Sequence, residues 1–183
     1  MLCGGASTRM GRDKATLELD GVPLAVRVAD ALGACLSRVR FVAKDESLRA
    51  LGRDVILDGR PEQAALVGVA AALAACEASA VLVAACDLPY LDPRIVLALC
   101  ALAPVDGPAD VIAPAGPRGP EPLLAIYRKR MLPEVERRIA RGELALHALL
   151  RDATCALVPE AELRALDPTL RSLTNANSPD DLR

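Results

Sequence analysis

Short apolar segments alternate along this chain with segments of helical periodicity, and this alternation constrains the fold more than any other feature. The apolar runs lie at residues 40–43, 54–57, 80–85 and 110–113. The helical patterns between them lie at residues 23–35, 63–76 and 93–102. Because the runs are apolar on both sides, they suit strands of a sheet that helices cover on both faces. The sequence therefore predicts a doubly wound, mostly parallel α/β sheet of the Rossmann-like kind.

The pattern changes after the last of these runs. A stretch rich in glycine and proline, residues 115–122, is predicted to be a loop. A strand at 123–127, helices at 132–140 and 144–150, and a strand at 156–158 are predicted to follow as a small antiparallel C-terminal addition. No internal repeat or low-complexity linker interrupts the chain, so residues 1–183 are predicted to form one domain.

Composition narrows the class of protein. The chain has 183 residues, of which 52% are hydrophobic and 25% are charged, a balance typical of a globular domain with a sizeable core. The formal net charge is −2, with no basic stripe, which argues against a nucleic-acid surface built on phosphate neutralisation. The longest low-charge run, residues 64–76, is too short to cross a bilayer. We therefore expect no nucleic-acid partner and no membrane partner.

Six cysteines occur without any CxxC pair, and the chain has a single histidine, His147. Disulfide frameworks and zinc sites use closer, paired spacings. Most of these cysteines lie in apolar stretches, where a free thiol behaves as a small hydrophobic group. The sequence therefore predicts reduced thiols and a cytoplasmic location. His147 is predicted to pack or to lie at the surface, not to act in catalysis.

Residues 3–14, CGGASTRMGRDK, form a stretch in which Met10 is the only large apolar residue, so it cannot bury itself. Two familiar phosphate-binding loops do not match it. A dinucleotide fingerprint needs glycines at its first, third and sixth positions. A P-loop needs four residues between its glycines, whereas Gly5 and Gly11 are separated by five.

The residue types in this stretch still favour an anionic ligand. Adjacent glycines allow backbone N–H groups to approach a phosphate closely. Ser7 adds a hydroxyl donor, and Arg9 and Lys14 add positive charge. A solvated turn without a ligand is the alternative. Such a loop should follow a strand, and only three residues precede it, so either that strand is very short or N-terminal residues are missing from this numbering.

Two aspartates follow predicted strands. Asp58 follows the run 54–57, and Asp87 follows the run 80–85. Ligands of open α/β sheets bind outside the carboxyl ends of the strands, and one or two carboxylates with substrate phosphates suit Mg²⁺. The alternatives are an Asx-turn for Asp58 and a helix cap for Asp87.

Asn175 and Asn177 alternate on an extended segment, so both side chains can face the same way. Capping of a following helix is the alternative for Asn177. Ser178 already suits that N-cap position, with Pro179 at the first helical position.

The segment LCGGASTRMGRDK at residues 2–14 closely resembles the signature LAGGxSxRMGxDK of the molybdenum cofactor guanylyltransferase family. Only Cys3, in place of the usual alanine, departs from it. Further segments are similar to family landmarks: LELDGVPL at 17–24, VILD at 55–58, CDLPYL at 86–91, EPL at 121–123 and NANSPDDL at 175–182. The first motif is shared with cytidylyl- and sugar-nucleotidyltransferases. The last motif, at 175–182, favours the molybdenum cofactor guanylyltransferases among these families.

The resemblance implies a nucleotidyltransferase that moves GMP from GTP to molybdopterin, with or without molybdenum, to give molybdopterin guanine dinucleotide and pyrophosphate. A glycine pair at Gly4 and Gly5 is typical of guanylyl members. Two alternatives stay open: a CTP-dependent or sugar-phosphate enzyme of the same superfamily, and a carrier of the cofactor without catalytic activity. Proteins that deliver molybdopterin are conceivable partners.

The resemblance also implies a role for each matching residue. Nucleotide binding is implied for Leu2, Cys3, Gly4, Gly5, Ser7, Lys14, Asp58 and Asp87. Catalytic roles are implied for Arg9, Lys14 and Asp87, with Mg²⁺ on Asp87. The molybdopterin side is implied for Asn175 and Asn177. The family often has an asparagine where this chain has Val42, so that contact with the nucleotide is absent or comes from another residue.

Overall fold

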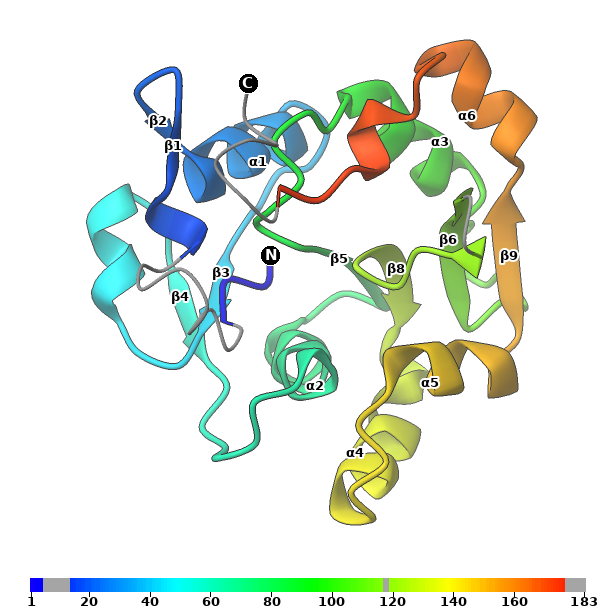
Figure 1. Ribbon diagram of the computed structural model, residues 1–183. Coiled ribbons are helices and arrows are strands. Elements are labelled where there is room, and N and C mark those ends of the chain that lie inside the picture. The colour runs from blue at the N-terminus through cyan, green and yellow to red at the C-terminus, as the bar shows by residue number, and fades with distance from the viewer. Residues whose placement is uncertain (5–13, 117–118, 177–183) are drawn as a thin grey trace.

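The computed structural model describes residues 1–4, 14–116 and 119–176 (Figure 1). Its strands are β1 Glu18–Leu19, β2 Val22–Pro23, β3 Phe41–Ala43, β4 Val55–Leu57, β5 Ala80–Ala84, β6 Val111–Gly116, β7 Gly119–Pro120, β8 Leu124–Arg128 and β9 Cys155–Val158. Its helices are α1 Leu24–Gly33, α2 Ala65–Ala75, α3 Pro93–Ala101, α4 Leu132–Ala140, α5 Leu146–Asp152 and α6 Glu160–Leu166. Short 3₁₀ turns occur at Lys14–Thr16, Ser47–Leu51, Lys129–Met131 and Arg171–Leu173.

Leu2 joins two groups of strands into one layer. It forms parallel bridges to Val42 in β3 and to Ala85 just after β5. β4 pairs with β3, and β9 pairs with β6, both parallel. β8 lies between β5 and β6 and is antiparallel to both. The α/β fold class is therefore confirmed, and the predicted antiparallel strand lies inside the sheet instead of at its margin.

Helices cover both faces of this layer, and the strands alternate between two cores. Phe41 faces the core formed with α1 and α3, whereas the next residue, Val42, faces the core formed with α2 and α4. Val83 and Ala84 of β5 divide in the same way. Figure 1 shows α1 and α3 on one side of the strands and α2, α4 and α5 on the other. This alternation explains why the strand sequences are apolar throughout.

Three features of the fold depart from the sequence-based expectation: a β6–β7 hairpin, helix α6 and a β1–β2 hairpin. β6 extends to Gly116 and pairs with β7, so part of the predicted 115–122 loop is a hairpin. Helix α6 was not predicted. β1 and β2 form a small hairpin that turns at Asp20 and Gly21, whose φ angles are 54° and 76°. An Asp-Gly pair is a common signal for such a turn, because both central residues need positive φ.

The six cysteines are free thiols, as predicted; Cys3 and Cys86 are buried and the other four are half-buried. Burial raises the pKa of Cys100 and of Cys155. Among the described helices, none combines the length and the apolar character needed to span a membrane.

Asp110 ties together the starts of β6 and β9. Its Oδ1 accepts a hydrogen bond from Arg130 Nε at 2.8 Å, and its Oδ2 accepts one from Thr154 N at 3.3 Å. The Arg130 hydrogen bond holds the pKa of Asp110 below its usual value. The ionised form therefore stabilises the fold above the unfolded-state pKa, and this stabilisation is lost as the pH falls through the folded-state pKa.

We expect Asp110→Asn to lower the free energy of unfolding at pH 7 by about 0.5–1 kcal/mol, the range of a partly exposed ion pair. The difference from the wild type should shrink below about pH 4, where the aspartate of the unfolded chain becomes protonated. Urea unfolding at pH 7 and pH 3 measures both values. Asp106→Asn, at an exposed loop residue, is the control. An equal loss at both pH values would contradict the prediction.

Candidate active site

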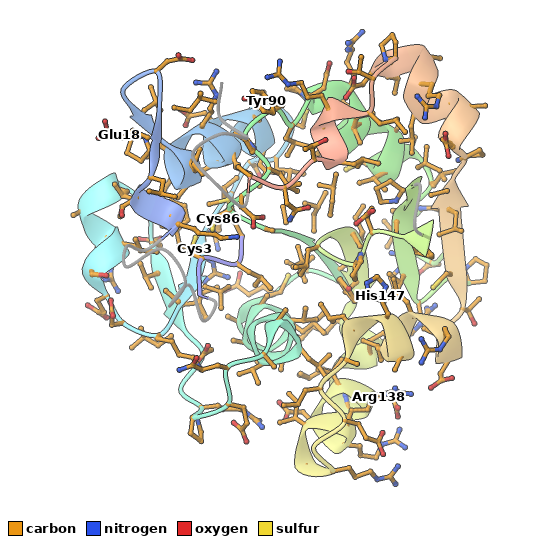
Figure 2. All side chains as sticks on the ribbon, in the orientation of Figure 1. Cys3, Glu18, Cys86, Tyr90, Arg138 and His147 are labelled. Atoms are coloured by element: carbon orange, nitrogen blue, oxygen red, sulfur yellow. The ribbon has the colours of Figure 1, made fainter. Side chains whose placement is uncertain are left out.

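The first residues of the chain run between β3 and β5 and leave the sheet at the carboxyl ends of those strands. Leu2 N donates a hydrogen bond to Ala84 O at 2.8 Å, and Cys3 N donates one to Val42 O at 2.9 Å. Leu2 and Cys3 are consequently buried, whereas Gly4 is exposed. In Figure 2, Cys3 and Cys86 lie close to each other near the middle of the view. The glycine-rich segment therefore begins at the edge where ligands of open α/β sheets bind.

Asp87 lies at the same edge and joins three distant parts of the chain. Its Oδ2 is 3.2 Å from Lys14 Nζ, and its Oδ1 accepts a hydrogen bond from Asn175 Nδ2 at 2.8 Å. The Asp87 carbonyl oxygen accepts a third bond, from Ala176 N at 2.8 Å. The side chain of Asp87 is 14% exposed and that of Lys14 is 23% exposed, so both can still meet a ligand. The structure thus brings together three of the predicted site residues.

The structure does not support the alternative that Asp87 caps helix α3. Helix α3 is capped by Asp92, whose Oδ1 accepts a hydrogen bond from Arg94 N at 2.8 Å. The same carboxylate pairs with the Arg94 side chain, and this hydrogen bond lowers the pKa of Asp92. The Asp87 carboxylate is left at the sheet edge with Lys14 and Asn175.

Asp58 directly follows β4, and its side chain is only 8% exposed. Its Oδ1 accepts hydrogen bonds from Lys44 Nζ at 3.0 Å and from Arg60 N at 3.3 Å. The bond from Arg60 N is the Asx-turn contact that sequence reasoning kept as an alternative. Lys44 adds an ion pair, so Asp58 is both a turn residue and a fixed carboxylate beside β3.

Sequence reasoning missed Lys44. Its ammonium group also donates to the carbonyl oxygens of Arg60 and Glu62, at 2.7 and 2.8 Å. These bonds hold the loop after β4 and orient Asp58, which makes Lys44 a positioning residue. Its position directly after the apolar run 40–43 was an available signal, because Asp58 and Asp87 were found in that way.

The other residues considered from the sequence do not belong to the described part of this site. Gly5, Ser7, Arg9 and Asn177 lie outside the described residues. Val42 is 3% exposed and packs in the core, so it offers no polar group to a ligand. His147 is exposed on α5, which confirms its assignment to packing or surface.

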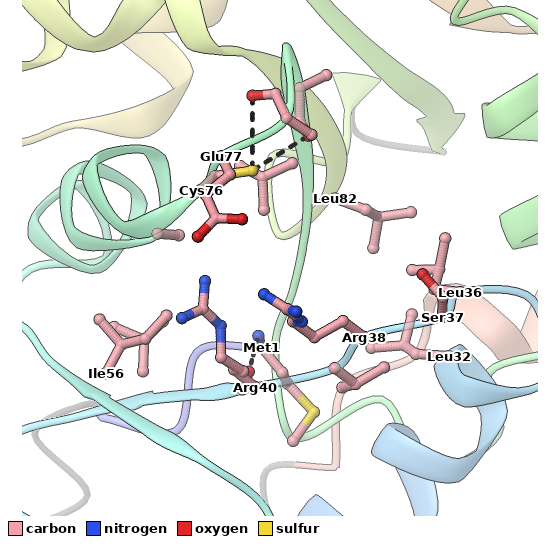
Figure 3. A pocket seen from close by; sticks show the side chains of 16 residues that line it. Met1, Leu32, Leu36, Ser37, Arg38, Arg40, Ile56, Cys76, Glu77 and Leu82 are labelled. Carbon is pink, nitrogen blue, oxygen red and sulfur yellow. Dashed lines mark hydrogen bonds between the residues drawn. The ribbon is translucent and has the colours of Figure 1, made fainter.

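A pocket of about 630 Å³ lies at the opposite edge of the sheet (Figure 3). It is lined by Met1, Arg38, Arg40, Cys76, Glu77 and Leu82, among others. These residues precede β3, follow α2 or lie in the first half of β5, so the pocket is at the amino ends of the strands. Its position removes it from Asp87 and from the edge where ligands of such sheets bind.

A divalent cation would need substrate atoms to complete its coordination at Asp87. The described part of the chain contains no cluster of three or more His, Cys, Asp or Glu side chains suited to a metal. Mg²⁺ in nucleotide sites is commonly held by one or two carboxylates together with phosphates and water. The Asp87 carboxylate fits this kind of site, provided that Lys14 shifts from Oδ2 to a phosphate.

Comparison with known proteins agrees with this geometry. Residues 1–159 match the family model described as the MobA-like NTP transferase domain. Along its whole length, the chain is 31% identical to a molybdenum cofactor guanylyltransferase of Desulfosudis oleivorans, of which it covers 90%. It is 35% identical to a probable molybdenum cofactor guanylyltransferase of Chloroflexus aggregans, again with 100% and 90% coverage.

Solved structures show the same fold. The crystal structure of molybdopterin-guanine dinucleotide biosynthesis protein A from Archaeoglobus fulgidus has a TM-score of 0.82 and 29% identity, covering 99% of this chain and 92% of that one. A nucleotidyl transferase from Methanothermobacter has a TM-score of 0.70 over 98% and 91% of the two chains. At 15% identity, this second similarity concerns the fold alone.

Proposed function

Because the chain belongs to the MobA-like NTP transferase family and is a nucleotidyltransferase, we propose that it transfers GMP from GTP to molybdopterin. The products are molybdopterin guanine dinucleotide and pyrophosphate. The observation that carries the proposal is the meeting of Lys14, Asp87 and Asn175 at the carboxyl edge of the sheet. The names of the two relatives, both molybdenum cofactor guanylyltransferases, support the choice of nucleotide and acceptor.

In this reaction, an oxygen of the acceptor's terminal phosphate attacks the α-phosphorus of GTP. A new P–O bond forms, the bond from the α-phosphorus to the bridging oxygen breaks, and pyrophosphate leaves with its electron pair. The attacking phosphate is already anionic, so the protein needs no general base. The contribution of the chain is to position two anionic substrates and to neutralise the charge on the leaving group.

The proposed roles follow from charge and position. Lys14, Arg9 and the N–H groups of Gly4 and Gly5 bind the triphosphate. Asp87 would hold Mg²⁺, and the bound ion would supply positive charge that polarises the phosphates.

The remaining residues serve the two substrates. Asp58, held by Lys44 at 3.0 Å, contacts the nucleotide. Leu2, Cys3 and Ser7 complete the nucleotide side. Asn175 orients Asp87 through Oδ1. The family resemblance assigns Asn175 and Asn177 to the molybdopterin side.

The test is a product analysis by mass. The protein is incubated with Mg²⁺, molybdopterin and either GTP or CTP, and with a sugar phosphate in place of molybdopterin. We expect a guanine dinucleotide and an equal amount of pyrophosphate from GTP and molybdopterin only. Equal use of CTP, or transfer to the sugar phosphate, would favour the other superfamily branches. Tight binding without pyrophosphate release would favour a carrier.

Gly4 provides a test of nucleotide choice. A Cβ at this position would lie 3.9 Å from Ala43 Cα and Lys44 Cγ, an ordinary contact, so the fold tolerates alanine. We expect Gly4→Ala to reduce kcat/KM for GTP about tenfold and for CTP less, because the methyl group occupies space beside the larger base. Gly33→Ala, where a Cβ meets nothing within 4 Å, is the matched control. An unchanged ratio of the two kcat/KM values would show that selectivity arises elsewhere.

A further inference from the structure

A small pocket lies next to Asp87, beside the start of β8. Its volume is about 120 Å³, similar to that of an engineered cavity of roughly 150 Å³ that accepts benzene. Leu88, Leu124 and Leu173 form much of its apolar wall, and Glu121, His147 and Asn175 supply its polar groups. In Figure 2, His147 marks the side of this region formed by α5. The pocket therefore suits one ring of a planar heterocycle with polar atoms on its edge.

Asn175 connects this pocket to the reaction centre. It lines the pocket and also donates to Asp87 Oδ1, whereas Lys14 contacts Oδ2 of the same carboxylate and does not line the pocket. The two oxygens of Asp87 are thus engaged by different partners, one of which belongs to the pocket. If the triphosphate lies with Lys14, the pocket belongs to the other substrate.

The carboxyl group of Glu121 lies close to Gly116, the last residue of β6. A Cβ added to Gly116 would lie 2.4 Å from Glu121 Oε1, 2.8 Å from Cγ and 3.0 Å from Cδ. The Glu121 side chain can therefore lie where it does only because residue 116 has no side chain. Glu121 N also donates to Pro114 O at 3.1 Å, which fixes the start of this segment on β6.

Resting on the proposed function, we propose that Glu121 is a specificity-determining residue that recognises the aminopyrimidinone edge of the acceptor's ring. This edge presents adjacent N–H and NH₂ donors, and a carboxylate offers two acceptor oxygens for them. The edge occurs both in the pterin of molybdopterin and in the guanine of GTP. The position of the pocket on the Asn175 side of Asp87 assigns it to the pterin.

Two variants remove the interaction in different ways. Glu121→Ala deletes the carboxylate, and Gly116→Ala displaces it. Gly116 has no positive φ, and the atoms in its way belong to the end of a flexible side chain, so this variant should fold. We expect either change to raise KM for molybdopterin about tenfold, because ring donors lose their acceptor, while KM for GTP changes less than twofold. Glu121→Gln keeps one acceptor oxygen, so its KM for molybdopterin should lie between that of these two variants and that of the wild type.

The controls are matched to the changes. Gly33→Ala adds a methyl group at a position where it meets nothing, and Glu143→Ala removes an exposed carboxylate after α4. Neither control should change KM for molybdopterin or KM for GTP. In the double variant Gly116→Ala/Glu121→Ala, the effects should not add, because no carboxylate remains for the methyl group to displace.

The kinetic experiment distinguishes the pterin of molybdopterin from the guanine of GTP as the ring that Glu121 binds. A rise in KM for GTP alone would assign the pocket to guanine and overturn the proposal, as would unchanged KM values. Equilibrium dialysis of molybdopterin with each variant separates this inference from the proposed function. Weaker binding by Glu121→Ala, with a wild type that forms no dinucleotide, would support the pocket and contradict the transferase reaction. Absence of molybdopterin binding by the wild type would overturn the pocket.

Discussion

Asp87→Ala is expected to reduce kcat about 10²–10³-fold, which is the cost of losing one preorganised charged group at a transferring phosphate. The variant removes the carboxylate proposed to hold Mg²⁺ and, at the same time, the partner of Lys14 and Asn175. The fold should persist, because the bond from Ala176 N goes to the Asp87 carbonyl oxygen and not to its side chain. Steady-state kinetics over a series of Mg²⁺ concentrations measures the effect.

The Mg²⁺ series distinguishes a metal ligand from a residue that only orients its neighbours. A metal ligand predicts that residual activity needs much more Mg²⁺ than the wild type does. Asp106→Ala, at an exposed loop residue, should retain full activity and the normal Mg²⁺ dependence. Retained activity in Asp87→Ala, or lost activity with an unchanged Mg²⁺ dependence, would count against the assignment.

Lys14→Met should cost about 2–4 kcal/mol in transition-state stabilisation, or about 30- to 1000-fold in kcat/KM. Methionine keeps the length and apolar stem of the side chain but removes the charge that we propose acts on the leaving pyrophosphate. Lys14→Arg keeps the charge and should recover part of the activity. A change below threefold in Lys14→Met would mean that Lys14 pairs with Asp87 for structure alone.

The sequence predicted the strands that are continuous apolar runs and the helices with a repeating apolar face. Helix α4 was predicted with its observed bounds, and the strands β3, β4 and β5 were predicted to within a residue or so. β3 is buried on both faces of the sheet, and α4 is buried on one face, so the apolar pattern of these segments records their burial. Strands of two residues, such as β1 and β7, are too short to carry such a pattern.

Strand order and part of the site could not be predicted, because they depend on partners far away in sequence. Nothing local to β8 indicates that it enters the sheet between β5 and β6. Asp87 was found because it ends an apolar run, and Asn175 because of its motif. The roles of Lys44 and of Gly116 arise from contacts with Asp58 and Glu121, and such contacts become visible only when the chain is folded.

The attachment of Asn175 and Ala176 to Asp87 has a consequence for the synthesis of this protein. The two segments are 88 residues apart, and the later one supplies both a side-chain and a backbone hydrogen bond to the earlier one. Chains are made from the amino terminus, so Lys14 and Asp87 leave the ribosome long before residue 175 is translated. A nascent chain of 150 residues would already hold the strands β3 to β8. It would nevertheless lack Asn175, which donates the hydrogen bond to Asp87 Oδ1. The arrangement of Lys14, Asp87 and Asn175 therefore forms only near the end of translation.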